Sequence, residues 1–315
     1  MRTVNLFKSL LGYLAFERCR ADVSWTTLGC DSVNINGASV DALWDSAVAM
    51  ASNAQSTIDT LVNARGIVPR STNSRAANAA KYMWGLKFPF SKLAGLDNAA
   101  KDTLRQVSSV YARAEGLMRQ NSGFLFCSGN SLTWGVVADY LNGAWYATIP
   151  GTDDVLVLLF TAGGPHGEAS RPCTDGETMG RTFKGRYISS NGQVPDELLV
   201  GILFCSNQFG SDWKGALTLG YPTEGKDPDP NHYKSAAGTI LHEMIHAVDM
   251  NTYLDHTSPH FAEGQVAYGF NRCYYLALSE PKRALMNADN YRVFAEMCMS
   301  PATTWGAPRL LNAGE

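Results

Sequence analysis

Apolar residues recur at helical spacing along three segments of the N-terminal part of the chain. The segment Asp41–Asn63 has this spacing and follows Ser39, a residue type that often begins a helix. The same pattern over Ala76–Gly85 and Ala99–Arg119 predicts two further helices. Because side chains three and four residues apart share one helix face, each helix is expected to bury an apolar face in a common core.

The pattern changes from Phe124 onward, where short β-branched or aromatic runs alternate with Gly, Asn and Asp. Such runs predict a small sheet with hairpins. The predicted strands are Phe124–Ser128, Thr133–Tyr140, Ala144–Ile149, Asp154–Phe160 and the buried strand Leu198–Cys205. The segment Gly163–Gly192 is rich in glycine and polar residues, so we expect a long loop there. Helices are expected after Gly220–Pro222, which gives an α+β fold with N-terminal helices, a small mixed sheet and C-terminal helices.

Composition places the chain among folded proteins and excludes several classes. Its 315 residues are 45% hydrophobic and 17% charged, which suffices for a packed core and rules out disorder as a description of the whole. With 26 Lys+Arg against 29 Asp+Glu, the chain has no basic excess for binding nucleic acid. No run approaches the roughly 18 apolar residues of a membrane span. We find no linker or internal repeat, and we expect one domain and a monomer.

The N-terminus has the order of a secretory signal. Two basic residues precede the short apolar run Ser9–Phe16, and Ala21 is a small residue before a cleavage point. The alternative is an ordinary amphipathic first helix, because the apolar run is short and the residues after it are charged. We predict that residues 1–21 are a signal peptide, that residues 22–315 form a single peptidase domain, and that the protein is secreted.

The chain has seven cysteines, and removal of residues 1–21 would remove Cys19. The six that remain are dispersed and include no C-x-x-C pair: Cys30, Cys127, Cys173, Cys205, Cys273 and Cys298. An even, dispersed set in a secreted chain is typical of disulfides rather than of zinc fingers or redox motifs. We therefore expect no free thiol, although six cysteines allow about 15 pairings and the connectivity is not predictable.

The strongest chemical signal is an H-E-x-x-H sequence that runs from His242 through Glu243 to His246. On the helix that Ser235 begins, residues four apart share a face, so both imidazoles can reach one metal ion. Glu243 is placed to hold the water that such an ion polarises, and zinc with three protein ligands keeps a position open for it. A pair of surface histidines is the alternative, but five of the six histidines lie within residues 232–260, which favours a zinc site.

A tetrahedral zinc site needs a third protein ligand, and several downstream residues are candidates. Past the expected end of the helix these are Asp255, His256, His260 and Glu263. A ligand on a later helix would be Glu280 or Glu296, but neither lies in a motif that matches such a site. The residues alone therefore leave the third ligand open.

Three segments together resemble a known family. These are Leu241–Ala247 (LHEMIHA), Ala267–Ser279 (AYGFNRCYYLALS) and Ala284–Cys298 (ALMNADNYRVFAEMC). Over about residues 235–298 the chain is similar to the deuterolysin-like aspzincin metalloendopeptidases of fungi and bacteria. The resemblance implies a zincin-like fold, a single zinc ion, secretion, disulfides and endopeptidase activity on protein or peptide substrates.

The chain departs from the family pattern in the segment of the third ligand. Gln265 stands three residues before Tyr268, where the family has its ligand Asp, and a neutral amide is a weak zinc ligand. Asp255 lies nine residues after the second histidine, close to the family spacing. We rank Asp255 first, Glu263 second and His260 third as the zinc ligand.

Other roles follow from the same resemblance. The family's transition-state Tyr is missing after the last predicted strand, and Tyr268, Tyr233 or Tyr221 could replace it as an oxyanion donor, with Tyr268 our first choice. Asp289 is expected to orient a ligand or line the substrate pocket, or alternatively to cap the last helix. In lysine-specific relatives a second acid follows three positions on, and here that position is Arg292, which argues against a preference for lysine.

Two functions fit these residues. The first is a secreted zinc endopeptidase in which Glu243 activates a water at the zinc and then protonates the leaving amine. The second is a zinc-capturing secreted protein, or an inactive homologue, on the same fold. Retention of Glu243 and the absence of Cys and His from the tail Pro301–Glu315 favour the peptidase, whereas the altered ligand segment favours the alternative.

Overall fold

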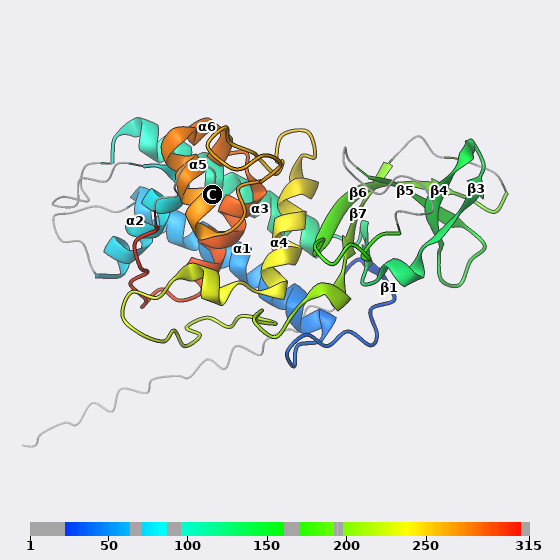
Figure 1. The fold of residues 1–315 in the computed structure, drawn as a ribbon, viewed down its shortest axis with the longest axis horizontal. Coiled ribbons are helices and arrows are strands. Elements are labelled where there is room, and N and C mark those ends of the chain that lie inside the picture. The colour runs from blue at the N-terminus through cyan, green and yellow to red at the C-terminus, as the bar shows by residue number, and fades with distance from the viewer. Residues whose placement is uncertain are drawn as a thin grey trace, which may run out of the picture.

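Helices and strands occupy separate parts of the molecule, with the helices gathered on one side and the sheet extending from them on the other (Figure 1). The computed structural model describes residues 23–63, 71–86, 96–160, 171–191, 194 and 198–309, so the predicted signal peptide lies outside the described residues. The helices are α1 (Val40–Asn63), α2 (Ser71–Trp84), α3 (Asn98–Arg119), α4 (Ala236–Val248), α5 (Phe270–Ser279), α6 (Pro281–Ala284) and α7 (Ala288–Cys298). The strands are β1 (Thr26–Leu28), β2 (Gly123–Phe126), β3 (Thr133–Val137), β4 (Tyr140–Thr148), β5 (Val155–Phe160), β6 (Gly180–Ile188) and β7 (Leu198–Phe204). The predicted α+β class is confirmed.

The strands form one mixed sheet in the order β1-β2-β7-β6-β5-β4-β3. The pairs β1–β2 and β2–β7 are parallel, and the remaining neighbours are antiparallel. The helices cover the β2 and β7 end of the sheet, where Leu125, Ile202 and Phe204 share one apolar core with α1, α3 and α4. The other end, made by β3, β4 and β5, extends beyond the helices (Figure 1).

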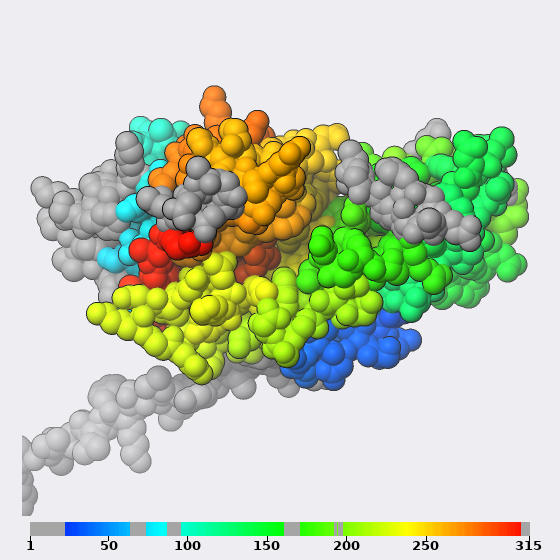
Figure 2. Space-filling model, viewed as in Figure 1, coloured from blue at the N-terminus to red at the C-terminus, as the bar shows by residue number. Residues whose placement is uncertain are grey.

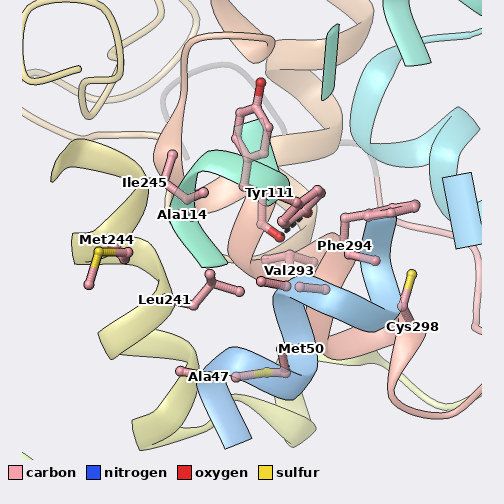
Figure 3. Close-up of a cluster of buried hydrophobic side chains, with 14 of the residues drawn as sticks. Ala47, Met50, Tyr111, Ala114, Leu241, Met244, Ile245, Val293, Phe294 and Cys298 are labelled. Carbon is pink, nitrogen blue, oxygen red and sulfur yellow. Dashed lines mark hydrogen bonds between the residues drawn. The ribbon is translucent and has the colours of Figure 1, made fainter. Parts of the chain in front are cut away.

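Helix α4 lies between the other helices and strands β6 and β7 (Figure 1). Ser235 begins the helix, because its side chain accepts a hydrogen bond from the backbone N–H of Gly238 at 2.9 Å. Leu241, Met244 and Ile245 of α4 pack with side chains of α1, α3 and α7 in the cluster of Figure 3. Burial of each such side chain contributes about 1.5–3 kcal/mol. This packing fixes the helix that carries the H-E-x-x-H sequence.

The helical periodicity of the N-terminal part predicts α1 and α3 closely, whereas α2 begins at Ser71, five residues before the predicted start at Ala76. The predicted segments Asp41–Asn63 and Ala99–Arg119 each match a helix, α1 or α3, to within one residue. The start of α3 is fixed by Asp97, whose side chain accepts a hydrogen bond from the N–H of Ala100 at 2.7 Å. No helix in the described part of the chain is long and apolar enough to span a bilayer.

The loop predicted over Gly163–Gly192 is wrong for residues 180–188, which form β6. This strand pairs with β5 on one side and with β7 on the other. Its alternation is hard to recognise because two residues that face α4, Gly180 and Thr182, lie beside the polar Glu243 rather than in an apolar core. Because this face of β6 lies beside a polar side chain, its residues are small or polar, and the strand therefore resembles a loop in composition.

The predicted strand Thr133–Tyr140 is also wrong as a single element. The chain turns between β3 and β4 at Ala138, which has a φ of 45°. The two strands pair antiparallel, with Thr133 opposite Tyr146. The short first strand, β1, has no counterpart among the predicted strands.

Two disulfides join segments at the ends of strands. They are Cys30–Cys127 and Cys173–Cys205. The first ties the residues after β1 to those after β2, and the second ties the segment before β6 to the end of β7. Both cross-links therefore lie in or beside the sheet.

The expectation that no thiol is free is wrong, because Cys273 and Cys298 are both free and buried. The Sγ of Cys273 lies 3.6 Å from Oδ2 of Asp289 in the first turn of α7. Cys298 is the last residue of α7, nine residues and about 13 Å further along the helix. A disulfide needs Cα atoms within about 7 Å, so these two cysteines are too far apart to pair.

Candidate metal centre and active site

Helix α4 carries His242 and His246 one turn apart, with their Nε2 atoms 3.1 Å from each other. A partner fixes the other nitrogen of each ring. The Nδ1 of His242 lies 3.2 Å from Oδ1 of Asp289, and the Nδ1 of His246 lies 2.6 Å from the backbone oxygen of Tyr253. A neutral imidazole has a single N–H, so donation from Nδ1 leaves both Nε2 lone pairs free to meet at one point.

Asp255 reaches this point from the segment that follows α4. Its two neighbours in the chain are tied to the start of α7: the N–H of Leu254 donates to the oxygen of Met286 at 2.9 Å, and the N–H of His256 donates to Oδ1 of Asn287 at 3.0 Å. These bonds hold the backbone on both sides of Asp255. The position of this side chain is therefore set by α7 as well as by α4.

The three side chains form a triangle of ligand atoms. Oδ1 of Asp255 lies 3.2 Å from Nε2 of His242 and 3.3 Å from Nε2 of His246. Ligands at zinc distances of 2.0–2.1 Å in a tetrahedron would be about 3.3 Å apart, which matches these spacings. Oδ1 is also buried without a hydrogen-bond partner, which is costly unless a cation binds there. The residues present therefore fit a zinc ion.

The other predicted ligands lie elsewhere. Among the described residues, the histidine and aspartate triangle is the one group of three or more such side chains that could hold a metal ion. His260 is exposed and packs against the ring of Tyr275 at 5.3 Å, and Glu263 is exposed. Gln265 accepts a hydrogen bond from Arg272.

The two glutamates considered on later helices are also engaged elsewhere. Glu280 pairs with Arg283 at 3.0 Å, next to α6. Glu296 accepts hydrogen bonds from the N–H and the hydroxyl of Ser235 at 2.7 and 2.9 Å, and so joins α7 to the start of α4. Neither belongs to the triangle of ligand atoms.

The charges of the three side chains in the triangle shift one another's pKa values. Burial lowers the pKa of His242, but the facing Asp255 carboxylate, together with Asp289 and Glu243, outweighs burial and raises the pKa to about 10. Burial would raise the pKa of Asp255, yet the two imidazoles hold it well below its usual range. The carboxylate is therefore ionised at neutral pH and attracts a cation. Because a metal-binding nitrogen must be deprotonated, a bound zinc ion would displace the proton from Nε2 of each imidazole and leave the Nδ1 proton in place.

A buried ion network continues from the triangle along α7. Arg292 donates to both carboxylate oxygens of Asp289, at 2.5 and 2.9 Å, and to Oε2 of Glu296 at 2.7 Å. Burial would raise the pKa of Asp289, but the Arg292 guanidinium holds it well below its usual range. Asn287, rather than Asp289, occupies the N-cap position of α7. Asp289 thus faces His242 with a charged carboxylate whose orientation is fixed.

The triangle opens into a cleft of about 860 Å³ between the helices and the sheet. Figure 2 shows the hollow between the yellow and orange helical segments and the green strands. One wall is α4 with Glu243, and the opposite wall is the segment Glu177–Thr182 that leads into β6. Glu243 is 5% exposed, so its carboxylate lies at the base of the cleft beside the metal position. An extended peptide chain has room to lie across this position.

Of the three tyrosines predicted as oxyanion donors, Tyr268 lines the cleft and the other two do not. Its hydroxyl donates to Oδ2 of Asp255 at 2.7 Å, and its ring centre is 5.7 Å from that of His242. The hydroxyl of Tyr233 accepts from the N–H of Glu224, and Tyr221 is buried beside it. Tyr268 is therefore the tyrosine within reach of a bound substrate.

Sequence reasoning missed two contacts of this site. The backbone oxygen of Tyr253 orients His246, and a backbone group leaves no signature in residue type. Thr182 contacts Glu243 but lies in the segment predicted to be a loop. Thr182 could have been found only if residues 180–188 had been predicted as a strand that packs against α4.

Comparison with known proteins bears on this site directly. Residues 226–296 match the aspzincin family, which is described as lysine-specific metallo-endopeptidases. A search of the curated proteins found no match to the chain. The matched segment contains α4, the segment that carries Asp255, α5, α6 and most of α7, and so includes every side chain of the triangle. Over this segment, which carries the whole metal triangle, the chain is similar to the aspzincin metallo-endopeptidases.

Proposed function

We propose that the protein is a secreted zinc endopeptidase in which His242, His246 and Asp255 hold one zinc ion. The observation that carries this proposal is the triangle of three ligand atoms, 3.1 to 3.3 Å apart, next to a buried glutamate in an open cleft. A zinc ion bound there would polarise a water molecule and the substrate carbonyl. Glu243 would be the general base.

Glu243 moves one proton in this mechanism. It accepts a proton from the attacking water as the water oxygen bonds to the carbonyl carbon. It then delivers this proton to the leaving nitrogen as the carbon–nitrogen bond breaks, which gives a carboxylic acid and an amine. Burial of Glu243 in the cleft excludes bulk water and strengthens its interaction with the reacting groups.

Tyr268 is the proposed oxyanion donor. Its side chain is 47% exposed at the cleft, and its hydroxyl can turn from Asp255 toward the carbonyl oxygen as negative charge develops there. A hydroxyl rotates freely about its C–O bond, so this change needs little movement of the ring.

We propose that the chain lacks the lysine preference named in the family description. Oδ1 of Asp289 accepts from Arg292 and faces Nδ1 of His242, while Oδ2 accepts from Arg292 and from the N–H of Gly269. A lysine ammonium would find no uncommitted oxygen on this carboxylate. In a peptide library, cleavage beside lysine should be no faster than beside a neutral side chain of similar size. A lysine preference of about tenfold or more would contradict this part of the proposal.

Secretion is supported by the two disulfides, which are typical of oxidising compartments. We propose that residues 1–21 are removed as a signal peptide and that residues 22–315 form the peptidase domain. Mass spectrometry of the protein exported by a secreting host should find residue 22 at the N-terminus. Retention of Cys19 in the exported protein would contradict the signal peptide.

Digestion of an unfolded protein substrate tests the function. The zinc-loaded protein should cleave it, and a chelator or the change Glu243→Gln should abolish cleavage. Cleavage that survives Glu243→Gln would overturn the mechanism. Tight zinc binding without cleavage would instead support the alternative, a zinc-capturing protein or inactive homologue.

A further inference from the structure

The sheet contributes one side chain that touches the carboxylate of Glu243. Thr182 of β6 is 6% exposed, and its Oγ1 lies 2.8 Å from Oε2 of Glu243 and 2.7 Å from the backbone oxygen of the same residue. The two residues are separated by 61 positions in the sequence. This contact therefore joins the sheet wall of the cleft to the helix wall at the proposed general base.

Strand pairing sets the register of Thr182 in the sheet. Thr182 pairs with Ile202 of β7, and the next residue, Phe183, pairs with Gly201 of β7 and with Phe160 of β5. Because side chains alternate across a strand, the ring of Phe183 lies on the opposite face of the sheet, where it packs against Phe126. A one-residue shift of β6 would exchange the two faces, so the pairing keeps the hydroxyl directed at α4.

Gly180 provides the space that the carboxylate occupies. A Cβ at this position would lie 2.8 Å from Cγ and 2.9 Å from Oε1 of Glu243, closer than unbonded atoms approach. Gly180 and Thr182 share the face of β6 that meets α4, two residues apart. One residue leaves room for the carboxylate and the other fixes one of its oxygens.

We infer that Thr182 is a positioning residue for Glu243, with Gly180 as its steric complement, an inference that rests on the proposed function. The hydroxyl holds Oε2, so that Oε1 is the oxygen presented to the attacking water. Without this bond the carboxylate could rotate about its last side-chain torsion, which is broad for Glu. Nothing in the H-E-x-x-H sequence supplies this restraint.

The Thr182 hydroxyl can keep its contact with Glu243 whether the carboxyl group is ionised or protonated. A threonine hydroxyl has one proton to donate and lone pairs that accept. Toward the ionised carboxylate it donates to Oε2. When Glu243 carries the proton on Oε1, Oε2 remains an acceptor, and the hydroxyl keeps the same hydrogen bond to it. The contact thus persists throughout the proton transfer.

Kinetics of three variants test the inference. Thr182→Val keeps the shape of the side chain and removes the hydroxyl, whereas Thr182→Ser keeps the hydroxyl. Thr148→Val is the control, because Thr148 is exposed on β4. We expect Thr182→Val to lower kcat about 10- to 100-fold with little change in KM, since misplaced catalytic groups cost this much. Thr182→Ser should stay within a few-fold of the parent, and the control should not change.

A second pair of variants tests the steric part. Gly180→Ala should displace the carboxylate and lower kcat with zinc content unchanged. Gly116→Ala is the matched control, because a Cβ at this helical position meets no atom within 4 Å. Full activity of Gly180→Ala would overturn the steric role, as would loss of zinc in proportion to activity.

Binding of acetohydroxamate to the zinc-loaded protein provides a readout that does not require turnover. Its hydroxyl proton must pass to a nearby carboxylate as its oxygens bind zinc, so affinity reports the position of Glu243. Calorimetry should show about tenfold weaker binding for Thr182→Val and parental binding for Thr182→Ser. Equal affinity of all three proteins, or equal loss in both variants, would overturn the inference. A parent that binds zinc and acetohydroxamate without cleaving protein would contradict the proposed function alone.

Discussion

The helical part of the molecule contains a buried network of charges, whereas the sheet contains both disulfides. In the helical part, Asp289, Arg292 and Glu296 link His242 to the start of α4 through a continuous chain of ion pairs and hydrogen bonds. In the sheet, the two cross-links join strand ends, and none of their cysteines belongs to the triangle of candidate metal ligands. Changes in the helical network should therefore lower both the unfolding free energy and the zinc affinity. Loss of a disulfide in the sheet should lower the unfolding free energy alone.

The largest effect is expected from Arg292→Leu, which leaves two buried carboxylates without their cation. Breaking a buried pair in this way costs about 3–5 kcal/mol of unfolding free energy. Zinc affinity should also fall about 10- to 100-fold, because Asp289 would no longer be held against His242. Urea unfolding and competition with a chelator measure the two quantities.

Arg105→Leu is the control for this change, because Arg105 pairs with Asp102 on the surface with 61% and 70% of the two side chains exposed. Such a pair contributes at most about 1 kcal/mol. If the two arginine variants were equally stable and bound zinc equally, the helical network would have no special role.

The next effect concerns the sheet. Replacing both cysteines of a disulfide with serine should lower stability by about 2–4 kcal/mol. The disulfides close separations of 97 and 32 residues, so loss of Cys30–Cys127 should cost about 1 kcal/mol more than loss of Cys173–Cys205. Zinc affinity should remain parental in both variants. A disulfide variant that folds but loses zinc would contradict the separation of the two regions.

A smaller effect is expected at the cleft where the two regions meet. Tyr268→Phe removes the proposed oxyanion donor and should lower kcat about 100-fold, equivalent to about 2.7 kcal/mol, without loss of zinc. Tyr275→Phe is the control, since Tyr275 packs against His260 away from the cleft. A parental kcat for Tyr268→Phe would remove this residue from the mechanism.

The smallest effect is expected from alkylation of Cys273 and Cys298, which tests whether these two cysteines of the helical part form a disulfide. Burial raises the pKa of Cys298 to about 12 and that of Cys273 well above its usual value, so neither is a thiolate at pH 8. Since the thiolate is the reactive form, iodoacetamide should not label the native protein at pH 8. Labelling should begin only in strongly alkaline solution, where the thiols ionise. The unreduced, denatured mature protein should take up two labels. No label after denaturation would mean that Cys273 and Cys298 form a disulfide.

The two regions also differ in how far the sequence predicts them. The helices α1 and α3 were predictable because their apolar residues face one core at a regular spacing. The strand β6 was not, because the inner face of the strand contacts a polar site rather than an apolar core. His242 and His246 followed from a local spacing, since a single helix places both side chains.

Tertiary contacts explain the rest of the site. Asp255 could be ranked by its distance along the chain, but it reaches the histidines because Leu254 pairs with the segment before α7. Thr182 could not be ranked at all, since its contact with Glu243 spans 61 residues and depends on the register of β6. Local sequence patterns predict which side chains of a single element share a face. Contacts between elements can be identified only once the fold is known.

Zinc stoichiometry of the Asp255→Ala variant shows whether Asp255 is a ligand of the metal centre. The parent should retain one zinc ion per chain after dialysis against a weak chelator, and so should the control Glu263→Ala, whose side chain is exposed and outside the triangle. We predict that Asp255→Ala loses its zinc under the same conditions while remaining folded by circular dichroism. Zinc bound to Asp255→Ala as tightly as to the parent would contradict the metal centre formed by His242, His246 and Asp255.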